Sequence, residues 1–166
     1  MKITRIGGRP PMSAGTSPNL ATRRTGGVPR PMRADARIRH IMDSDVVIWY
    51  LRGHQPTREL LDGPLQRALA CSTLTIYEVW RGVRDHERVR TRRYLGALEA
   101  IPVSATVAYA AAEYRQAFRA RGITLGDMDS VIAATARVRG LTLLTYNRRH
   151  FPMDDIELYD PMPVLE

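Results

Sequence analysis

Three carboxylates lie beside apolar segments of the chain, in positions from which they could act together. Asp43 closes one apolar segment, Glu78 follows a second by one helical turn, and Asp129 opens a helix-like run that leads into a third. Acids at the ends of strands, or in the first turn of the next helix, meet at the carboxyl edge of a parallel sheet, where open α/β folds bind ligands. Such carboxylates repel one another unless a hard cation joins them, and Mg²⁺ or Mn²⁺ is the natural candidate because both take oxygen ligands. The pattern predicts a small metal-dependent enzyme that acts on phosphate.

Each acid also has a purely structural interpretation. Asp43 or Asp45 would serve as the N-cap of the helix that follows, because Asp is favoured at that position. Glu78 has a Thr three residues before it, which fits a capping box in which the glutamate accepts from the N-cap amide. Asp127 and Asp129 suit the first turn of a helix, where negative charge is favoured. Only the three acids in combination favour a functional role over these local ones.

Apolar runs alternate with helix-like segments from residue 36 onward. Alternating strands and helices predict an α/β fold with three layers, in which a mostly parallel central sheet has helices on both faces. A proline at position 102 predicts an edge position for the strand that contains it. Strands are expected at 38–43, 69–72, 101–103, 141–145 and 156–159, and helices at 46–51, 57–61, 75–83, 84–98, 106–121 and 128–139.

The positive charge of the chain is confined to its N-terminal part. The 166 residues carry a net charge of +8, and residues 1–40 hold nine of the 25 Lys and Arg but only one of the 17 acids. Residues 41–166 are therefore net neutral. Residues 1–36, rich in Gly, Pro and Arg, are expected to be a disordered basic extension, or sequence upstream of a true start near Met32, with a basic nucleic-acid-binding arm as the alternative. Residues 37–166 are expected to form one domain.

Several classes of protein are disfavoured by composition. Lys2 is the only lysine, which argues against a Walker-type phosphate loop and against Schiff-base chemistry. Cys71 is the only cysteine, so no internal disulfide can form, and it is expected in the core. No apolar stretch approaches the roughly 18–20 residues of a membrane helix. A cytoplasmic protein without a membrane segment is expected.

Four segments, in this order, resemble PIN-domain proteins and, more narrowly, the VapC-type toxins of bacterial toxin–antitoxin pairs. The resemblance covers residues 38–160 and implies a PIN-like three-layer fold with a Mg²⁺- or Mn²⁺-dependent endoribonuclease activity. It also implies an RNA substrate, a homodimer and a cognate antitoxin. The four segments are Ile41-Met-Asp-Ser-Asp-Val-Val-Ile-Trp-Tyr-Leu51, Ser72-Thr-Leu-Thr-Ile-Tyr-Glu-Val79, Asp129-Ser-Val-Ile-Ala-Ala-Thr-Ala136 and Leu143-Leu-Thr-Tyr-Asn-Arg-Arg-His-Phe151.

The resemblance assigns roles to individual residues. Asp43, Glu78 and Asp129 match the family's catalytic, metal-binding acids in order. Asn147 lies where the family carries Asp or Asn, and because it is neutral, Asp45 or Asp127 is a candidate for a fourth acid. Supporting polar residues are expected at Ser44, Thr145 and Asn147, and candidates to bind the RNA backbone are Arg81, Arg84, Arg88, Arg148 and Arg149.

An antitoxin of this family lays a helix into a groove and blocks the acidic site. Trp49, Tyr50 and Leu51 are expected to line such a groove in this chain. Leu60 and Leu61 are further candidates for its lining, although a place in the core is the stronger expectation for both.

Two other functions compete with the nuclease. Asp43-Ser-Asp45-Val resembles the opening motif of haloacid-dehalogenase-type phosphatases, in which Asp43 would be the nucleophile. That family expects a cationic residue ahead of its later acids, and the segments around Glu78 and Asn147 have no place in it. A non-catalytic RNA- or protein-binding module of the same fold is the other alternative, and the three retained acids argue against it.

Overall fold

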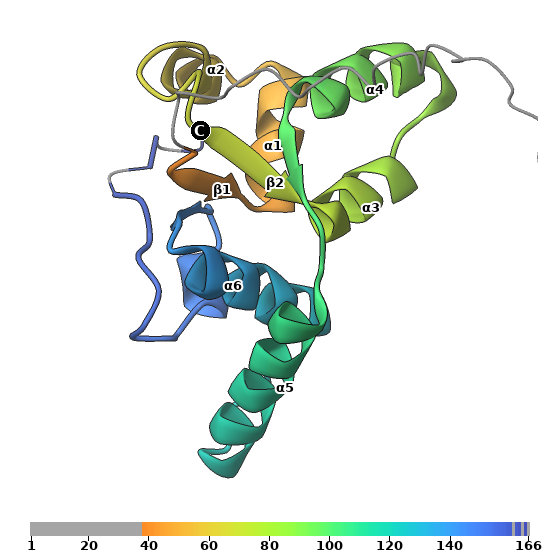
Figure 1. Ribbon diagram of the computed structural model, residues 1–166. Helices are drawn as coiled ribbons and strands as arrows, with labels where there is room; N and C mark the ends of the chain where they lie inside the picture. Colours follow the sequence, from red (N-terminus) through yellow and green to blue (C-terminus); the bar gives the residue numbers. More distant parts are fainter. Residues whose placement is uncertain (1–37, 161, 164, 166) are drawn as a thin grey trace, which may run out of the picture. The chain divides into compact units, whose positions relative to one another are not determined.

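A four-stranded, wholly parallel sheet with the strand order β3-β2-β1-β4 forms the centre of the computed structural model (Figure 1). The structure describes residues 38–160, 162, 163 and 165, so the expectation for residues 1–36 lies outside the described residues. The strands are β1 (His40–Met42), β2 (Leu69–Ser72), β3 (Glu99–Ile101) and β4 (Thr142–Leu144). The helices are α1 (Ser44–Arg52), α2 (Gln55–Asp62), α3 (Thr73–Arg81), α4 (Arg88–Ala97), α5 (Ala105–Ala120) and α6 (Asp127–Arg139), with short 3-10 turns η1 (Asp85–Glu87) and η2 (Arg148–His150).

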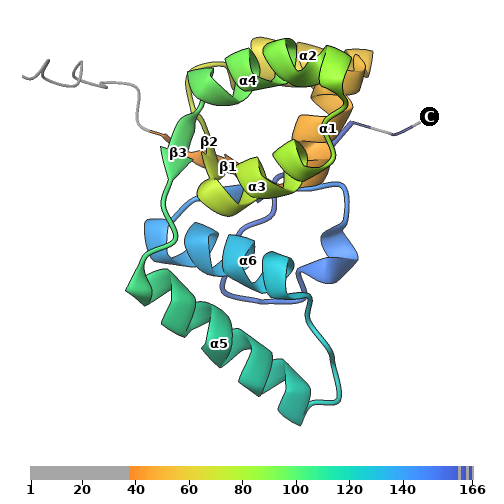
Figure 2. The same ribbon diagram turned by 90° about the vertical axis from the view of Figure 1, so that its right-hand side faces the viewer.

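Successive residues of each strand face opposite sides of the sheet, and each side has its own apolar core. Ile41 of β1 packs with α5 and α6, whereas Met42 packs with α1, α2, α3 and α4. The neighbouring strand β4 divides in the same way, with Leu143 on the first side and Leu144 on the second. Figure 2 shows the α5–α6 pair on one face of the sheet and α1, α2 and α4 across the other. The expected three-layer α/β fold with a parallel sheet is confirmed.

The helix α5 shows why this layer forms. Its buried residues recur at helical spacing along one stripe, which faces α6. α6 contributes the small buried residues Ala133, Ala134 and Ala136 to the same core, and their size allows the two helices to pack closely. A glycine with positive φ, Gly140, ends α6 and turns the chain into β4.

The structure differs from the expected elements in three places. The strand expected at 156–159 is reduced to a single parallel bridge between Leu143 and Leu158, flanked by two backbone hydrogen bonds. The helix expected over 84–98 is divided into η1 and α4, because the Glu87 carboxylate accepts from the Arg84 backbone and closes a tight turn there. The strand expected at 101–103 is found instead at Glu99–Ile101 as β3, and Pro102 lies just after its end. Its expected edge position is confirmed, since β3 is at one end of the sheet. In the described part, no helix is long and apolar enough to cross a membrane.

The strand order creates a switch point between β1 and β4. The chain passes from β1 to β2 in one direction, and it returns through α5 and α6 to place β4 on the other side of β1. In open α/β sheets, ligands bind outside the carboxyl ends of the strands at such a point. Asp43 follows β1 directly and Thr145 follows β4 directly, so both are placed at this crevice.

Candidate active site at the carboxyl edge of the sheet

Asp43 is the most firmly held of the acids. It is the N-cap of α1, where its Oδ1 accepts from the Ser44 amide at 2.6 Å. Its Oδ2 accepts from the Thr145 hydroxyl at 3.0 Å, and its own amide donates to the Leu144 carbonyl at 2.9 Å. Only 5% of Asp43 is exposed. The N-cap interpretation is therefore confirmed for Asp43, while Asp45 lies within the first turn of the helix.

Asp45 is a second acid that lies in the same crevice, next to Asp43. Its Oδ2 accepts from the Tyr146 amide at 3.0 Å, whereas its Oδ1 is buried without a hydrogen-bond partner among the described residues. Burial, followed by the charge of Asp43, raises the pKa of Asp45 to about 7. A buried, unpartnered carboxylate oxygen is costly unless a proton or a cation satisfies it.

Glu78 reaches the site from α3. The capping-box interpretation is wrong, because the N-cap of α3 is Ser72 and Glu78 lies in the second half of the helix. Thr75, the residue that the capping box would have placed at the N-cap, is buried instead. Its hydroxyl donates to the Met42 carbonyl at 3.3 Å and so links α3 to the end of β1. Burial raises the pKa of Glu78, and the charges of Asp43 and Asp129 raise it further.

Asp129 lies in the first turn of α6, as one of the local interpretations predicted. Its Oδ2 is 3.3 Å from Nδ1 of His150, a residue to which the sequence pattern assigned no role. The carboxylate also lies directly over Gly126, where a Cβ atom would be only 2.5 Å from Oδ2. Asp127, the other candidate in this turn, forms an ion pair with Arg115 instead.

These acids interact through their charges without forming a finished metal site. Burial raises the pKa of Asp43, and the charge of Asp129 opposes its ionisation further, although the Ser44 and Thr145 hydrogen bonds act in the opposite direction. In the part of the chain that the structure describes, no three His, Cys, Asp or Glu side chains lie close enough together to hold a metal ion as they stand. The donors are nevertheless all carboxylate oxygens, they repel one another, and one Asp45 oxygen has no partner. This chemistry fits an oxygen-preferring divalent cation.

The supporting polar residues surround Asp43. The Ser44 hydroxyl is 3.4 Å from Asp43 Oδ1, and its hydrogen bond to Glu78 lowers the pKa of that acid. The buried Thr145 hydroxyl, which donates to Asp43, itself accepts from the Asn147 amide at 3.0 Å. Asn147 therefore contributes its backbone amide to the site, and a supporting role for its side chain stays a prediction.

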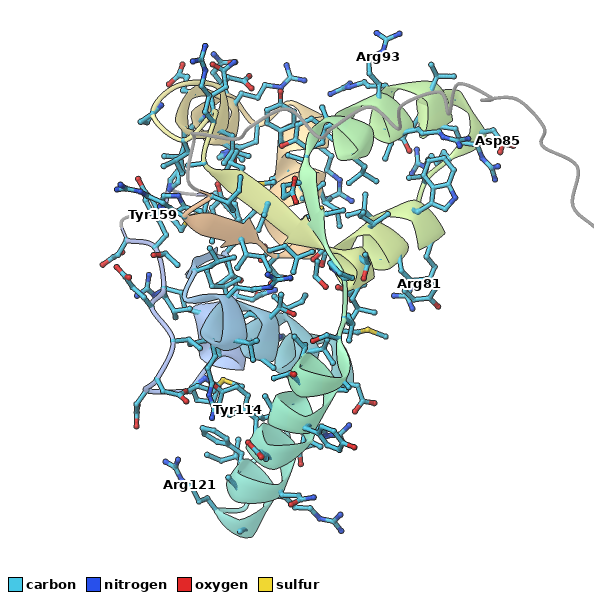
Figure 3. The ribbon with its side chains drawn as sticks, viewed as in Figure 1. Arg81, Asp85, Arg93, Tyr114, Arg121 and Tyr159 are labelled. Atoms are coloured by element: carbon cyan, nitrogen blue, oxygen red, sulfur yellow. The ribbon has the colours of Figure 1, made fainter. Side chains whose placement is uncertain are left out.

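The arginines predicted to bind the RNA backbone differ in whether another group of the protein already binds their guanidinium. Arg148 donates to the Tyr159 carbonyl at 3.1 Å and lies 3.4 Å from Asp160, and Arg88 pairs with Asp85 at 3.0 Å. Arg81 projects from α3 (Figure 3), where its charge lowers the pKa of Glu78, and Arg149 is exposed. Arg84 lines a pocket next to Glu78.

The PIN domain family model matches residues 41–155 of the chain. The chain belongs to the PIN-domain family. Ribonuclease VapC10 of Mycobacterium tuberculosis is 36% identical over 118 residues, a match that spans 68% of this chain and 86% of that protein. Ribonuclease VapC19 of the same species is 30% identical over 115 residues, which are 68% of this chain and 92% of that protein. The resemblance to VapC-type PIN proteins is thus confirmed.

Solved structures with the PIN fold agree with this assignment. A toxin–antitoxin complex from Klebsiella pneumoniae is 27% identical with a TM-score of 0.59, covering 72% of this chain and 99% of that one. DNA-bound VapBC from Salmonella typhimurium is 21% identical with a TM-score of 0.67, covering 74% and 97%, and supports the fold alone. Membership of the PIN family favours the nuclease over the phosphatase.

Proposed function

We propose that this PIN-domain chain is the toxin of a toxin–antitoxin pair and hydrolyses RNA phosphodiesters at the carboxyl edge of its sheet. The observation that supports this most is the convergence of Asp43, Glu78 and Asp129 from three separate elements. The charge of Asp129 raises the pKa of both Asp43 and Glu78, and the charge of Asp43 also raises the pKa of Glu78. The VapC ribonucleases to which the chain is 30–36% identical support the choice of RNA as substrate.

Asp43, Glu78 and Asp129 would hold Mg²⁺ or Mn²⁺, with Asp45 as a further acid. Such an ion, when bound, lowers the pKa of a coordinated water and offsets charge on the phosphate. Thr145 and Ser44 orient the Asp43 carboxylate for this role by hydrogen bonding. Asp127 would have to leave Arg115 to contribute, so Asp45 is the better placed of the two additional candidates.

An antitoxin partner is proposed from the toxin–antitoxin complexes among the similar structures. Of the residues expected to line its groove, Leu51 does line the pocket next to Glu78, and Tyr50 is partly buried against Tyr94. Leu61 is buried in the core and Leu60 packs against it, as their stronger expectation predicted. The homodimer remains a proposal carried by the family resemblance.

The deciding experiment is cleavage of a total RNA pool by the purified protein with Mg²⁺, with Mn²⁺ and with EDTA. Discrete fragments are expected with metal, and they should disappear in EDTA and in the variant Asp43→Asn. The matched control is Asp154→Asn, which neutralises an exposed acid away from the site. Cleavage by Asp43→Asn at the wild-type rate would contradict the proposal, and intact RNA binding without any cleavage would favour the binding module.

A further inference from the structure

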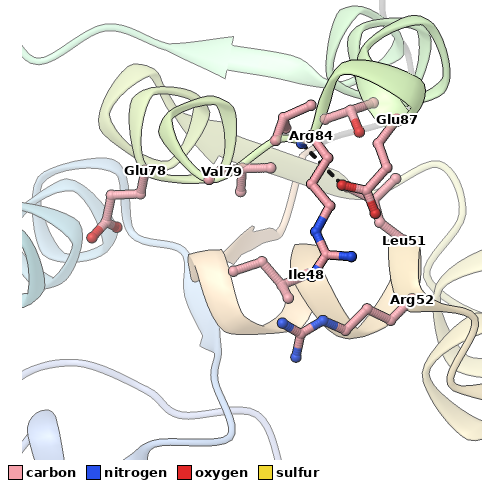
Figure 4. A pocket seen from close by; sticks show the side chains of 10 residues that line it. Ile48, Leu51, Arg52, Glu78, Val79, Arg84 and Glu87 are labelled. Atoms are coloured by element: carbon pink, nitrogen blue, oxygen red, sulfur yellow. Dashed lines mark hydrogen bonds between the residues drawn. The ribbon is translucent and has the colours of Figure 1, made fainter.

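A pocket of about 400 Å³ opens next to Glu78 and leads away from the acids between α1, α3 and the η1 turn (Figure 4). Its volume lies within the roughly 300–1,000 Å³ of small-ligand pockets. Figure 4 shows Glu78 at one end and Leu51 and Glu87 at the other, with the guanidinium groups of Arg52 and Arg84 drawn beside Ile48 in the middle. The remaining lining residues are Val79, Gly82, Val83 and Thr91.

Both arginines line this pocket, and local structure holds the backbone that carries each of them. α1 ends at Arg52, because Gly53 adopts φ 90° and turns the chain away. The Arg84 amide donates to Glu87 Oε2 at 3.1 Å, and this contact holds the backbone turn from which the Arg84 side chain extends. The Arg90 guanidinium of α4 donates to the Leu51 carbonyl and joins α4 to the end of α1.

The charges of these two arginines are available to a ligand. Among the described residues, no carboxylate lies within 4.0 Å of either guanidinium, whereas Arg88, Arg137 and Arg148 all have acidic partners. Arg52 contacts the Trp49 ring, at 5.7 Å from its centroid, a contact that leaves the charge in place. Two unpaired guanidinium groups in one pocket form a site for an anion with several oxygens, because their planar donors match phosphate.

We propose that this pocket is a nucleotide subsite, in which Arg52 and Arg84 bind the backbone phosphate of a nucleotide that neighbours the cleaved phosphodiester. The proposal rests on the proposed ribonuclease function and names where its substrate extends from the acids. Ile48 and Leu51 cover the apolar face of the ribose or base. Glu87 repels phosphate, so it faces hydroxyl or amino donors of the sugar or base.

The test measures binding rather than cleavage. The affinity of a short, labelled single-stranded RNA of mixed sequence is measured in EDTA at several salt concentrations by fluorescence anisotropy. The variant is Arg52→Gln/Arg84→Gln, and the control Arg119→Gln/Arg139→Gln removes the same charge from exposed arginines elsewhere. The pocket variant should bind about tenfold or more weakly, as expected for lost charge-assisted hydrogen bonds. Its slope of log K against log salt should fall by about 0.7, the value for one phosphate contact on a single strand.

Two results would overturn the proposal. Equal losses in both double variants, with unchanged thermal unfolding, would show a diffuse charge effect. Unchanged affinity in the pocket variant would leave the pocket to a protein partner. Because no metal is present in this assay, failure of the proposed function would appear separately, as absence of cleavage in Mg²⁺ or Mn²⁺ while the binding loss persisted.

Discussion

Asp43 and Asp129 belong to the same acidic site, yet the fold restrains them in different ways. Asp43 follows a central strand, is 5% exposed, and has both carboxylate oxygens bonded by Ser44 and Thr145. Asp129 lies on a helix, its side chain is 25% exposed, and its contacts are His150 at 3.3 Å and the bare backbone of Gly126. The strand side of the site, at Asp43, is therefore held in place by hydrogen bonds, whereas the helix side, at Asp129, has fewer contacts and can adjust.

Metal addition should have the largest effect on stability, because a bound cation would draw Asp129 on α6 toward Asp43 at the end of β1. Mn²⁺ at a hundredfold excess over its Kd should raise the free energy of unfolding by about 2.7 kcal/mol, since it binds only the folded state. Thermal unfolding with and without Mn²⁺ measures this. Asp43→Asn should abolish the increase, and an equal increase in that variant would place the metal elsewhere.

Thr145→Val tests the organised side by removing one hydroxyl at nearly constant volume. The buried Asp43 Oδ2 loses its donor, so the variant should lose about 1–3 kcal/mol of stability. RNA cleavage should fall roughly 10–100-fold, the loss seen when a group that orients a metal ligand is removed. Urea unfolding and initial cleavage rates measure the two effects. Thr145→Ser keeps the hydroxyl and should recover most of the cleavage rate. Wild-type cleavage by Thr145→Val would show that Asp43 needs no such support.

Gly126→Ala tests the adjustable side. A methyl group at this position would meet the Asp129 carboxylate at 2.5 Å, and the flexible side chain must rotate away. Cleavage should fall about tenfold, corresponding to roughly 1.4 kcal/mol in the transition state. Stability should also fall by about 0.5–1 kcal/mol, because Gly126 is the N-cap of α6 and Ala is less favoured there than Gly. The control is Gly96→Ala in α4, where a Cβ meets no atom within 4 Å and helix propensity predicts a gain of about 0.5–1 kcal/mol. Equal activity in both variants would mean that the observed Asp129 rotamer is not needed.

His150→Ala should have the smallest effect. The histidine is half exposed, and contacts of this kind contribute little because solvent screens them. Cleavage is expected to change by less than about threefold at neutral pH, measured alongside His86→Ala as an exposed histidine on η1. A large loss specific to His150 would assign it a direct role in the reaction and would mean that the helix side is more constrained than its exposure indicates.

Much of this arrangement could be predicted from short segments of sequence. The strand over residues 69–72 has the bounds expected of it, and Asp43 follows a buried strand as predicted. These features depend on residues that are close in sequence, because the apolar pattern of a few consecutive residues is enough to predict a buried strand. The parallel sheet followed from the alternation of strands and helices, and the family from four motifs in order.

Other features depended on contacts between distant segments. Ser72 rather than Thr75 caps α3, and the Thr75 hydroxyl instead donates to the Met42 carbonyl, 33 residues earlier in the chain. Asp127 forms an ion pair with Arg115 of α5, a contact between distant segments that distinguishes it from its neighbour Asp129.

By itself, the sequence determined the secondary-structure pattern and the family, since local propensity and motif order suffice for each, and it predicted the three principal acids. Only the tertiary structure decided which oxygens are held, which are left without a partner, and which arginines remain available to a ligand. Those properties depend on which side chains are brought together by packing across the sheet, and residue spacing along the chain carries little of that information.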